Sequence, residues 1–85
     1  MSRRAAPKLR AAFAHRLRQL RKRRGWSQER LGDKAGLSGK FVGEVERGEK
    51  SISLDNLAHL ARVLRVPLLA MLKGLQARKT GKEGA

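Results

Sequence analysis

The side chains of this sequence that could do chemistry are cations rather than catalytic or metal-binding groups. The chain contains no cysteine, and its two histidines, His15 and His59, lie far apart in sequence, so we expect no metal site and no cofactor. No Ser/His/Asp constellation or phosphate-binding loop is present, and 85 residues leave little room for a substrate pocket, so we do not expect an enzyme. The formal net charge, in contrast, is +14, and basic side chains at this density attract polyanions, either nucleic acid or anionic lipid.

The positive charge is concentrated toward the two ends of the chain. Residues 1–24 contain ten Lys or Arg and no acidic residue, and residues 67–85 contain four basic residues and one acidic residue. Between them, residues 25–66 carry seven basic and six acidic side chains, the balance of an ordinary mixed-charge domain. We therefore expect the electrostatic attraction for a polyanion to come largely from residues 1–24.

A membrane is the competing partner for so basic a chain. No run approaches the ~20 apolar residues that a membrane-spanning helix needs, and the N-terminus lacks the uninterrupted apolar stretch of a secretory signal. Leu9–Arg24 could form a basic amphipathic helix, but its apolar stripe is narrow and contains a single aromatic residue, Phe13. Helices that lie on membranes favour a broader stripe. Nucleic acid is therefore the expected partner, and a membrane is not.

The elements that must position these cations are helices. Ser27, Ser38 and Ser53 each follow one apolar residue directly and precede another by four positions, the pattern of a serine N-cap with a hydrophobic staple. Other apolar residues recur at spacings of three and four, as on one face of a helix, and no segment alternates like a strand. The fold class is therefore predicted to be all-α, with five helices over 9–24, 28–35, 39–47, 54–64 and 67–76.

These helices are predicted to form one domain over residues 9–76. Residues 1–8 are polar and basic, and Pro7 disfavours an earlier helix start, so we expect them to form a disordered basic arm. Residues 77–85 are rich in Gly and Lys, and we expect a disordered basic tail. Gly25 fits the left-handed position that follows the first helix.

The second and third helices are joined by only three residues, Gly36, Leu37 and Ser38. A turn of three to four residues that contains glycine is the geometry of the DNA-binding helix-turn-helix. In the third helix the apolar residues mark a buried edge, and the residues left facing outward are Gly39, Lys40, Gly43, Glu44 and Arg47. That face is short and polar, which suits a helix lying in the major groove of duplex DNA.

The segment Gln28–Ser38, together with Val42, Val45 and Glu46–Gly48, resembles the Cro and phage-repressor helix-turn-helix family, the XRE class. The similarity extends on both sides of this segment. The resemblance implies a lambda-repressor-like domain of five helices that binds double-stranded DNA.

The resemblance also implies roles for individual residues. The positions that touch base edges match Lys40, which prefers guanine, and Glu44, which can accept a hydrogen bond from the amino group of cytosine. Gln28 matches a glutamine at a helix N-terminus that bonds a DNA phosphate, and the other expected phosphate contacts are Ser27, Arg24, Arg47 and Lys50. Arg21 and Glu46 match a partly buried ion pair that ties the first helix to the third.

Several of these residues have a second interpretation. Glu44 can pair with Lys40 one helical turn away and touch no base, because a carboxylate beside DNA is otherwise repelled. Gly39 and Gly43 either let the backbone approach the bases closely or are indifferent surface positions. Trp26 is interpreted as a core residue rather than as a platform on which bases stack.

The sequence departs from the family pattern at two positions. Gly32 stands where the family usually has alanine, at the close approach of two helices, and it costs ~1 kcal/mol of helix propensity. Arg65 stands where glycine commonly ends the fourth helix. A left-handed backbone there would cost a non-glycine residue on the order of 1 kcal/mol.

Together these features predict a small sequence-specific transcriptional regulator, a repressor or autoregulator, in the bacterial cytoplasm and associated with the nucleoid. Compact proteins of this kind also include restriction–modification controllers and antitoxins, and an antitoxin has a protein toxin as its partner. The family usually binds palindromic operators as two-fold dimers. The fifth helix has more apolar surface than one face can bury, which predicts a homodimer interface formed by Leu69, Met71, Leu72 and Leu75.

Overall fold

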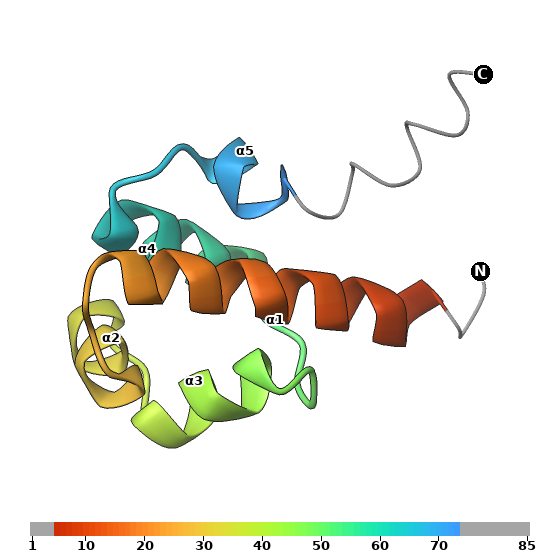
Figure 1. Cartoon of the computed structure of the whole chain (residues 1–85), viewed down its shortest axis with the longest axis horizontal. Coiled ribbons are helices and arrows are strands. Elements are labelled where there is room, and N and C mark those ends of the chain that lie inside the picture. Colours follow the sequence, from red (N-terminus) through yellow and green to blue (C-terminus); the bar gives the residue numbers. More distant parts are fainter. Residues whose placement is uncertain (1–4, 74–85) are drawn as a thin grey trace.

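The structure is a computed structural model that describes residues 5–73, with side chains described from Pro7 onward (Figure 1). Over this range the chain forms the helices α1 (Ala5–Arg23), α2 (Gln28–Ala35), α3 (Gly39–Glu46), α4 (Leu54–Leu64) and α5 (Leu68–Met71). The described residues contain no strand. The prediction of an all-α fold with five helices is therefore confirmed.

α1 and α5 differ most from their predicted bounds, and α3 ends at Glu46, one residue before its predicted end. α1 begins at Ala5 rather than at Leu9, so part of the predicted arm is helical. Pro7 lies in the first turn of α1, where its missing N–H would have no partner within the helix in any case. α5 spans four residues and ends at Met71. The remainder of the predicted fifth helix and the predicted tail, from residue 74 on, lie outside the described residues.

Three serine N-caps explain why α2, α3 and α4 begin where they do. The hydroxyl oxygens of Ser27, Ser38 and Ser53 each accept a hydrogen bond from the backbone N–H three residues further on, at 3.0, 2.9 and 3.1 Å. Each bond satisfies an N–H that has no partner within its helix, and the predicted starts of all three helices are confirmed. Gly25 and Gly36 follow α1 and α2 with φ of +73°, the left-handed conformation predicted for Gly25.

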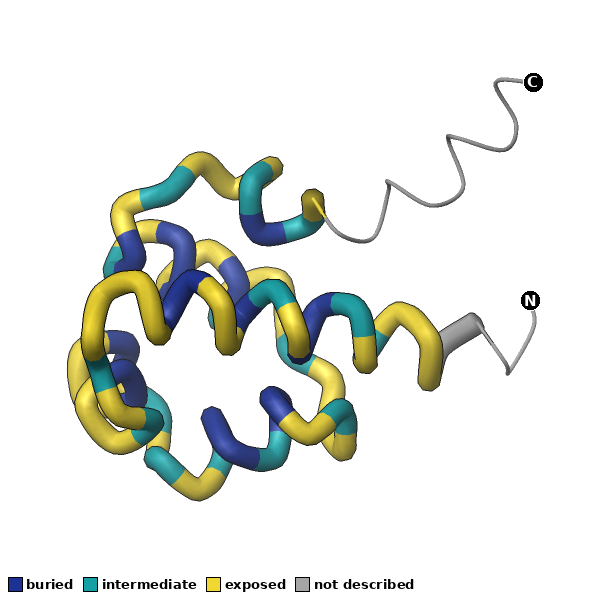
Figure 2. Tube along the Cα trace, in the orientation of Figure 1, coloured by how far each residue is buried: buried dark blue, intermediate teal, exposed yellow. Residues whose placement is uncertain are grey.

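The helices enclose a single core between them. α2 and α3 pack against each other, α1 lies across α3 and α5, and α4 contacts α2 and α5 (Figure 1). Each helix contributes one of the largest fully buried side chains, namely Leu17, Leu31, Val42, Leu60 and Met71. Figure 2 shows buried positions on every one of these helices. Because helices of eight residues are marginal in water, this shared burial and the serine caps together must stabilise α2 and α3.

The last described helix presents different residues from those expected. Met71 is fully buried and closes the core, so its predicted place in a dimer interface is wrong. Leu72 is half-buried and packs against the same core. Leu68 and Leu69, in the first turn of α5, are instead 47% and 80% exposed. The apolar surface that α5 leaves open is therefore its first turn.

A glycine in the middle of α2 sets the distance between α2 and the turn that follows it. A methyl group on Gly32 would lie 2.6 Å from the carbonyl oxygen of Leu37 and 3.0 Å from the carbonyl carbon of Ser38. These are backbone atoms, which cannot move aside as a flexible side chain can. The departure from the family's usual alanine therefore has a structural reason in this chain.

Candidate nucleic-acid interface

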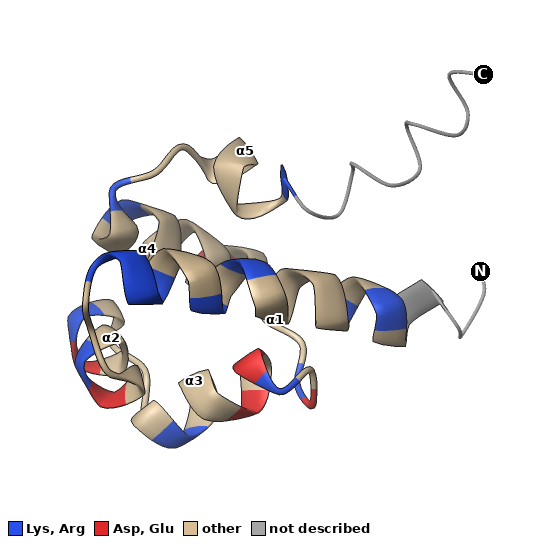
Figure 3. Ribbon diagram, in the orientation of Figure 1, with Lys and Arg blue, Asp and Glu red and all other residues tan. Residues whose placement is uncertain are grey.

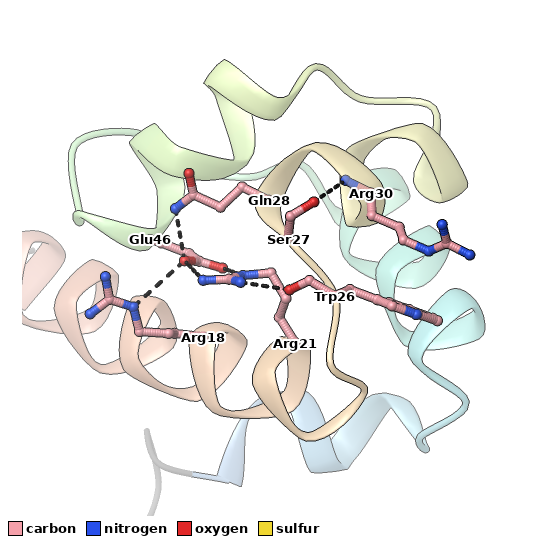
Figure 4. Close-up of polar contacts among 7 residues, drawn as sticks. All are labelled: Arg18, Arg21, Trp26, Ser27, Gln28, Arg30 and Glu46. Carbon is pink, nitrogen blue, oxygen red and sulfur yellow. Dashed lines mark hydrogen bonds and ion pairs between the residues drawn. The ribbon is translucent and has the colours of Figure 1, made fainter.

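A buried ion pair joins α1 to the end of α3. Arg21 donates from Nε to Oε2 of Glu46 at 2.6 Å and from Nη2 to Oε1 at 2.9 Å, a bidentate geometry (Figure 4). The Glu46 side chain is fully buried, and that of Arg21 is 9% exposed. Arg21 also donates from Nη1 to the backbone oxygen of Trp26 at 2.7 Å. The expected ion pair is thus present, and it additionally fixes the segment that leads into α2.

Burial and hydrogen bonding act in opposite directions on Glu46. Burial alone would raise the pKa of this carboxyl group, but hydrogen bonds from Arg21 and Gln28 and the charges of Arg21 and Arg18 outweigh it. The pKa of Glu46 therefore lies below its ordinary value. The hydrogen bond to Glu46 likewise holds the pKa of Arg21 above its ordinary value. Both groups are charged near neutral pH.

Gln28, the first residue of α2, belongs to the same network. Its Nε2 donates to Oε1 of Glu46 at 3.1 Å. Because a carboxylate only accepts hydrogen bonds, the amide nitrogen must face Glu46, and its second N–H is left over for another acceptor. Arg18 approaches the same carboxylate oxygen with its Nε at 3.7 Å. Glu46 thereby holds the N-terminus of α2 in a fixed position relative to α1 and α3, which the sequence did not predict.

The N-termini of α2 and α3 open onto one hollow at the surface. It has a volume of about 430 Å³ and is lined by Ser27, Gln28, Glu29, Gly39 and Lys40. Two helix N-termini present partial positive charge and unpaired backbone N–H groups to this hollow, and Lys40 adds a full positive charge that is opposed by the exposed carboxylate of Glu29. The hollow therefore suits an anion such as a phosphate group. It brings together four of the residues that were predicted to contact DNA, namely Ser27, Gln28, Gly39 and Lys40.

Fewer residues of α3 face outward than the sequence indicated. Lys40 is exposed and Glu44 is half-exposed, as a groove-reading face requires. Among the described residues no ion pair joins Lys40 to Glu44. Figure 3 shows α3 with a basic residue toward its beginning and acidic residues toward its end. This polarity leaves Lys40 and Glu44 available as separate hydrogen-bonding groups one turn apart.

The two glycines of α3 have packing roles instead of an outward position. A methyl group on Gly39 would lie 2.8 Å from Cγ and 3.0 Å from Cα of Glu29, so Gly39 lets α3 start against the first turn of α2. Gly43 is buried, and a methyl group there would lie 3.1 Å from Oε1 of Gln28 and 3.2 Å from Nη1 of Arg47. The prediction that Gly43 faces outward is therefore wrong, because two long side chains cover it.

The end of α3 carries a second, exposed ion pair. Arg47 donates from Nε to Oε2 of Glu49 at 2.9 Å and from Nη2 to Oε1 at 3.2 Å. The hydrogen bond from Arg47 holds the pKa of the Glu49 carboxyl group below its ordinary value. Both side chains are more than half exposed, and Lys50 beside them is exposed as well. An exposed pair is weak, so a phosphate group can displace Glu49 from Arg47.

The cations of α1 do not all face solvent. Arg10 donates to the backbone oxygen of Gly48 at 3.1 Å, and Arg16 donates to that of Ala70 at 2.8 Å. With Arg21 in the buried pair, three arginines of the basic N-terminal segment hold the α3–α4 loop, α5 and α3 against α1. The expectation that residues 1–24 serve mainly to attract a polyanion is therefore too simple, since part of this charge stabilises the fold.

Within residues 5–73, no group of three His, Cys, Asp or Glu side chains is placed to hold a metal ion. None of the helices in that range combines the length and the apolar character needed to cross a lipid bilayer.

The fold and the site define a class of protein. Two short helices joined by a three-residue turn, with three more helices forming the core around them, make up a lambda-repressor-like helix-turn-helix domain. The chain belongs to the helix-turn-helix family HTH_3, the XRE class of DNA-binding proteins, which matches residues 17–70. This is a family of transcription regulators and not of enzymes.

Individual relatives agree with this assignment. The chain is 39% identical over 70 residues to a hypothetical transcription factor of Neisseria meningitidis, a match that covers 82% of this chain and 66% of the relative. A solved structure of the restriction–modification controller protein C.AhdI from Aeromonas hydrophila is 38% identical, with a TM-score of 0.74 over 76% of this chain and 94% of that one. The P22 c2 repressor bound to a synthetic operator is 31% identical, with a TM-score of 0.68 over 73% and 94% of the two chains. The chain thus spans 66% of the Neisseria protein's length.

Proposed function

We propose that this protein binds specific operator sequences in duplex DNA and thereby regulates transcription, acting in the bacterial cytoplasm on the nucleoid. The observation that carries the proposal is the hollow shared by the N-termini of α2 and α3, with Lys40 exposed at its edge. The similarity to the P22 c2 repressor, whose structure contains a synthetic operator, supports the same function. Recognition would divide between residues that hold the sugar–phosphate backbone and residues that read bases.

The backbone of one DNA strand would be held at both ends of α3. At the beginning, a phosphate would enter the hollow, where it meets the N–H groups of α2 and the free amide N–H of Gln28. The hydroxyl of Ser27 is already used as the N-cap of α2, so Ser27 would bind the phosphate through its backbone. At the far end, Arg47 and Lys50 would contact a second phosphate once Glu49 is displaced. The buried Glu46 network keeps these two anchor points at a constant distance.

The bases would be read by two side chains of α3. Lys40 lies in the first turn of α3 and Glu44 lies one turn later, so both can enter the major groove from one helix face. Lys40 would donate to O6 and N7 of guanine, and Glu44 would accept from N4 of cytosine. Gly39 and Gly43 act through packing, because they allow α2 to lie close enough for Gln28 to reach across α3.

The protein would bind its operator as a two-fold homodimer. Leu68 and Leu69 are exposed next to each other at the start of α5, and apolar side chains in such a position favour burial against a second copy. Leu72 flanks them on the described part of the surface, whereas Met71 is occupied in the core. Leu75 lies outside the described residues. A two-fold dimer would place two copies of α3 on successive turns of the major groove.

A role as a restriction–modification controller is the second candidate. The supporting observation is the similarity to C.AhdI, of which the match covers 94%. Both candidates require operator binding, so one experiment tests them together. Duplexes bound by the protein are selected from a random pool, and the affinity for the enriched sequence is measured at several salt concentrations. We expect one sequence to be enriched. We also expect the logarithm of the binding constant to fall as the logarithm of the salt concentration rises, with a slope of about 0.9 for each phosphate contact. An unenriched pool, or an affinity independent of salt, would contradict operator binding.

A further inference from the structure

A second hollow shares no lining residue with the proposed phosphate site. It has a volume of about 330 Å³ and is lined by Arg24, Trp26, Lys34, Arg62, Val63 and Arg65. Three helices end around it: Arg24 follows α1, Lys34 is in the last turn of α2, and Arg65 caps α4. Figure 3 shows the basic ends of α1 and α4 and basic segments of α2 on the same side of the molecule, at the left of the view. No residue of α3 lines this surface, and Arg24, which the sequence predicted as a phosphate contact, lies here and not in the hollow of Ser27, Gln28 and Lys40.

The hollow contains four cations and no acidic residue. Arg24 and Lys34 lie over the ring of Trp26, at 4.8 and 5.0 Å from its centroid. The ion pairs of the described residues involve other arginines, so none of the four lining cations has a carboxylate partner. The carbonyl ends of three helices reduce the repulsion among these charges, which explains how the folded chain tolerates them. A ligand of negative charge would complement the hollow.

Arg65 is held in this hollow by a strained backbone. Its φ of +57° is left-handed, and it is the only non-glycine residue with a positive φ in the described part of the chain. Glycine would adopt this conformation freely, whereas a residue with a Cβ atom is disfavoured there. The Arg65 side chain is exposed, and the left-handed backbone is supported by hydrogen bonds from the N–H of Arg65 to the carbonyl of Arg62 at 3.1 Å and from the N–H of Val66 to that of Ala61 at 3.0 Å. The left-handed backbone ends α4 at Arg65 and thereby sets where its side chain leaves the helix beside the hollow.

We propose that this hollow binds an acidic segment of a partner protein. Carboxylates would pair with the arginines of the rim, and apolar side chains between them would lie on the floor formed by Trp26 and Val63. Duplex DNA fits less well, because none of the lining residues belongs to α3, so DNA held in this hollow would not be read by that helix. Arginine and tryptophan are also the residue types that dominate the energetics of protein interfaces. The site goes beyond operator binding and does not depend on it.

The fluorescence of Trp26 can report on binding at this site. Trp26 is its only tryptophan, so the intrinsic fluorescence of the protein comes from the floor of the hollow. The probe is a synthetic peptide of alternating Glu and Leu, which has no aromatic residue of its own. We expect a saturable change in Trp26 fluorescence as the peptide draws Arg24 and Lys34 away from the ring. The change should weaken as salt is raised, since the contacts are exposed charge pairs.

Two double variants of equal net charge make the test specific. Arg62→Gln with Arg65→Gly removes two cations of the hollow, and the glycine keeps the fold intact because it accepts the left-handed backbone. Lys22→Gln with Arg23→Gln removes two exposed cations that do not line the hollow. We expect peptide affinity to fall about five-fold or more in the first variant and to change less than about two-fold in the second.

Three outcomes would overturn the proposal. The first is an unchanged Trp26 signal at saturating peptide, and the second is an equal loss of affinity in both double variants. The third is binding of a phosphate compound at the same site, which is tested with tripolyphosphate and a short DNA duplex as alternative probes. If either one, at matched charge, produced the same saturable signal and lost it in the Arg62→Gln, Arg65→Gly variant, the hollow would be a phosphate site and not a protein-docking site.

Discussion

Glu46, the last residue of α3, receives two hydrogen bonds from the guanidinium of Arg21 on α1 and a third from the amide of Gln28 on α2. A single buried carboxylate therefore ties together the three helices that surround the proposed DNA site. The serine caps fix where α2 and α3 begin, and this network, together with the shared core, fixes their positions relative to α1. Stability and DNA binding should consequently both depend on Glu46.

Replacing Glu46 with alanine should destabilise the protein strongly. The change leaves the guanidinium of Arg21 buried without its partner, and breaking a buried pair in this way costs about 3–5 kcal/mol. The free energy of unfolding is measured in urea for the wild type and Glu46→Ala. Glu49→Ala serves as a control, because it breaks an ion pair that is exposed, and it should leave stability nearly unchanged. Equal effects of the two variants would contradict a structural role for the buried pair.

The stabilisation by Glu46 should also depend on pH in a defined direction. Its pKa is held below the ordinary value of 4.5 in the folded protein, so the unfolded chain takes up the proton first as the pH falls. The contribution is complete above the ordinary pKa and is lost as the pH falls through the lowered value. The free energy of unfolding is measured in urea between pH 7 and pH 3. The wild type should have the higher value near pH 7, and its difference from Glu46→Gln should disappear in the acidic part of the range. An advantage that stayed constant down to the lowest pH would show that Glu46 is not the group responsible.

Glu49 should restrain DNA binding, because it occupies the guanidinium of Arg47 in the free protein. In Glu49→Gln the partner of Arg47 is neutral, so no ion pair has to be broken before Arg47 meets a phosphate. We expect a several-fold higher affinity for duplex DNA, with the log–log salt slope at least as steep as in the wild type. Fluorescence anisotropy at several salt concentrations measures both quantities. Weaker binding in Glu49→Gln would mean that Glu49 itself supports the DNA-bound state.

Self-association should depend on the exposed first turn of α5. Leu69→Ser removes an exposed apolar side chain from the proposed dimer surface, and the dimer should dissociate at a protein concentration several-fold higher than for the wild type. Leu54→Ser is a matched control, since Leu54 at the start of α4 has the same 80% exposure as Leu69. Sedimentation equilibrium gives the dissociation constants. Equal weakening by both substitutions would place the dimer surface elsewhere.

The parts of the structure that follow from local chemistry could be predicted from the sequence. The starts of α2, α3 and α4 follow from Ser27, Ser38 and Ser53, because an N-cap involves only residues within one helical turn. The bounds of α2 and α4 were predicted correctly for the same reason. The Arg21–Glu46 pair was expected from a family resemblance, since no local pattern connects residues so far apart in sequence.

The parts that depend on tertiary packing could not be predicted in the same way. Gly43 was expected to face outward, but the long side chains of Gln28 and Arg47 cover it. Met71 was predicted to lie at a dimer surface, but in the short helix α5 its side chain is buried in the core. The pairing of Arg47 with Glu49 depends on how the chain bends after α3, which helical periodicity does not describe. In each case the burial or partner of a residue is set by another segment of the chain.

The most direct test of base reading by α3 is operator selection with Lys40→Ala. Duplexes are selected from a random pool by the wild type and by Lys40→Ala, and the enriched sequences are compared position by position. If Lys40 reads a guanine through the major groove, the variant should lose its preference at one or two positions, with a discrimination loss of about 1–3 kcal/mol there, and keep the rest of the sequence. An identical sequence preference with uniformly weaker binding would contradict direct reading and reduce Lys40 to a phosphate contact.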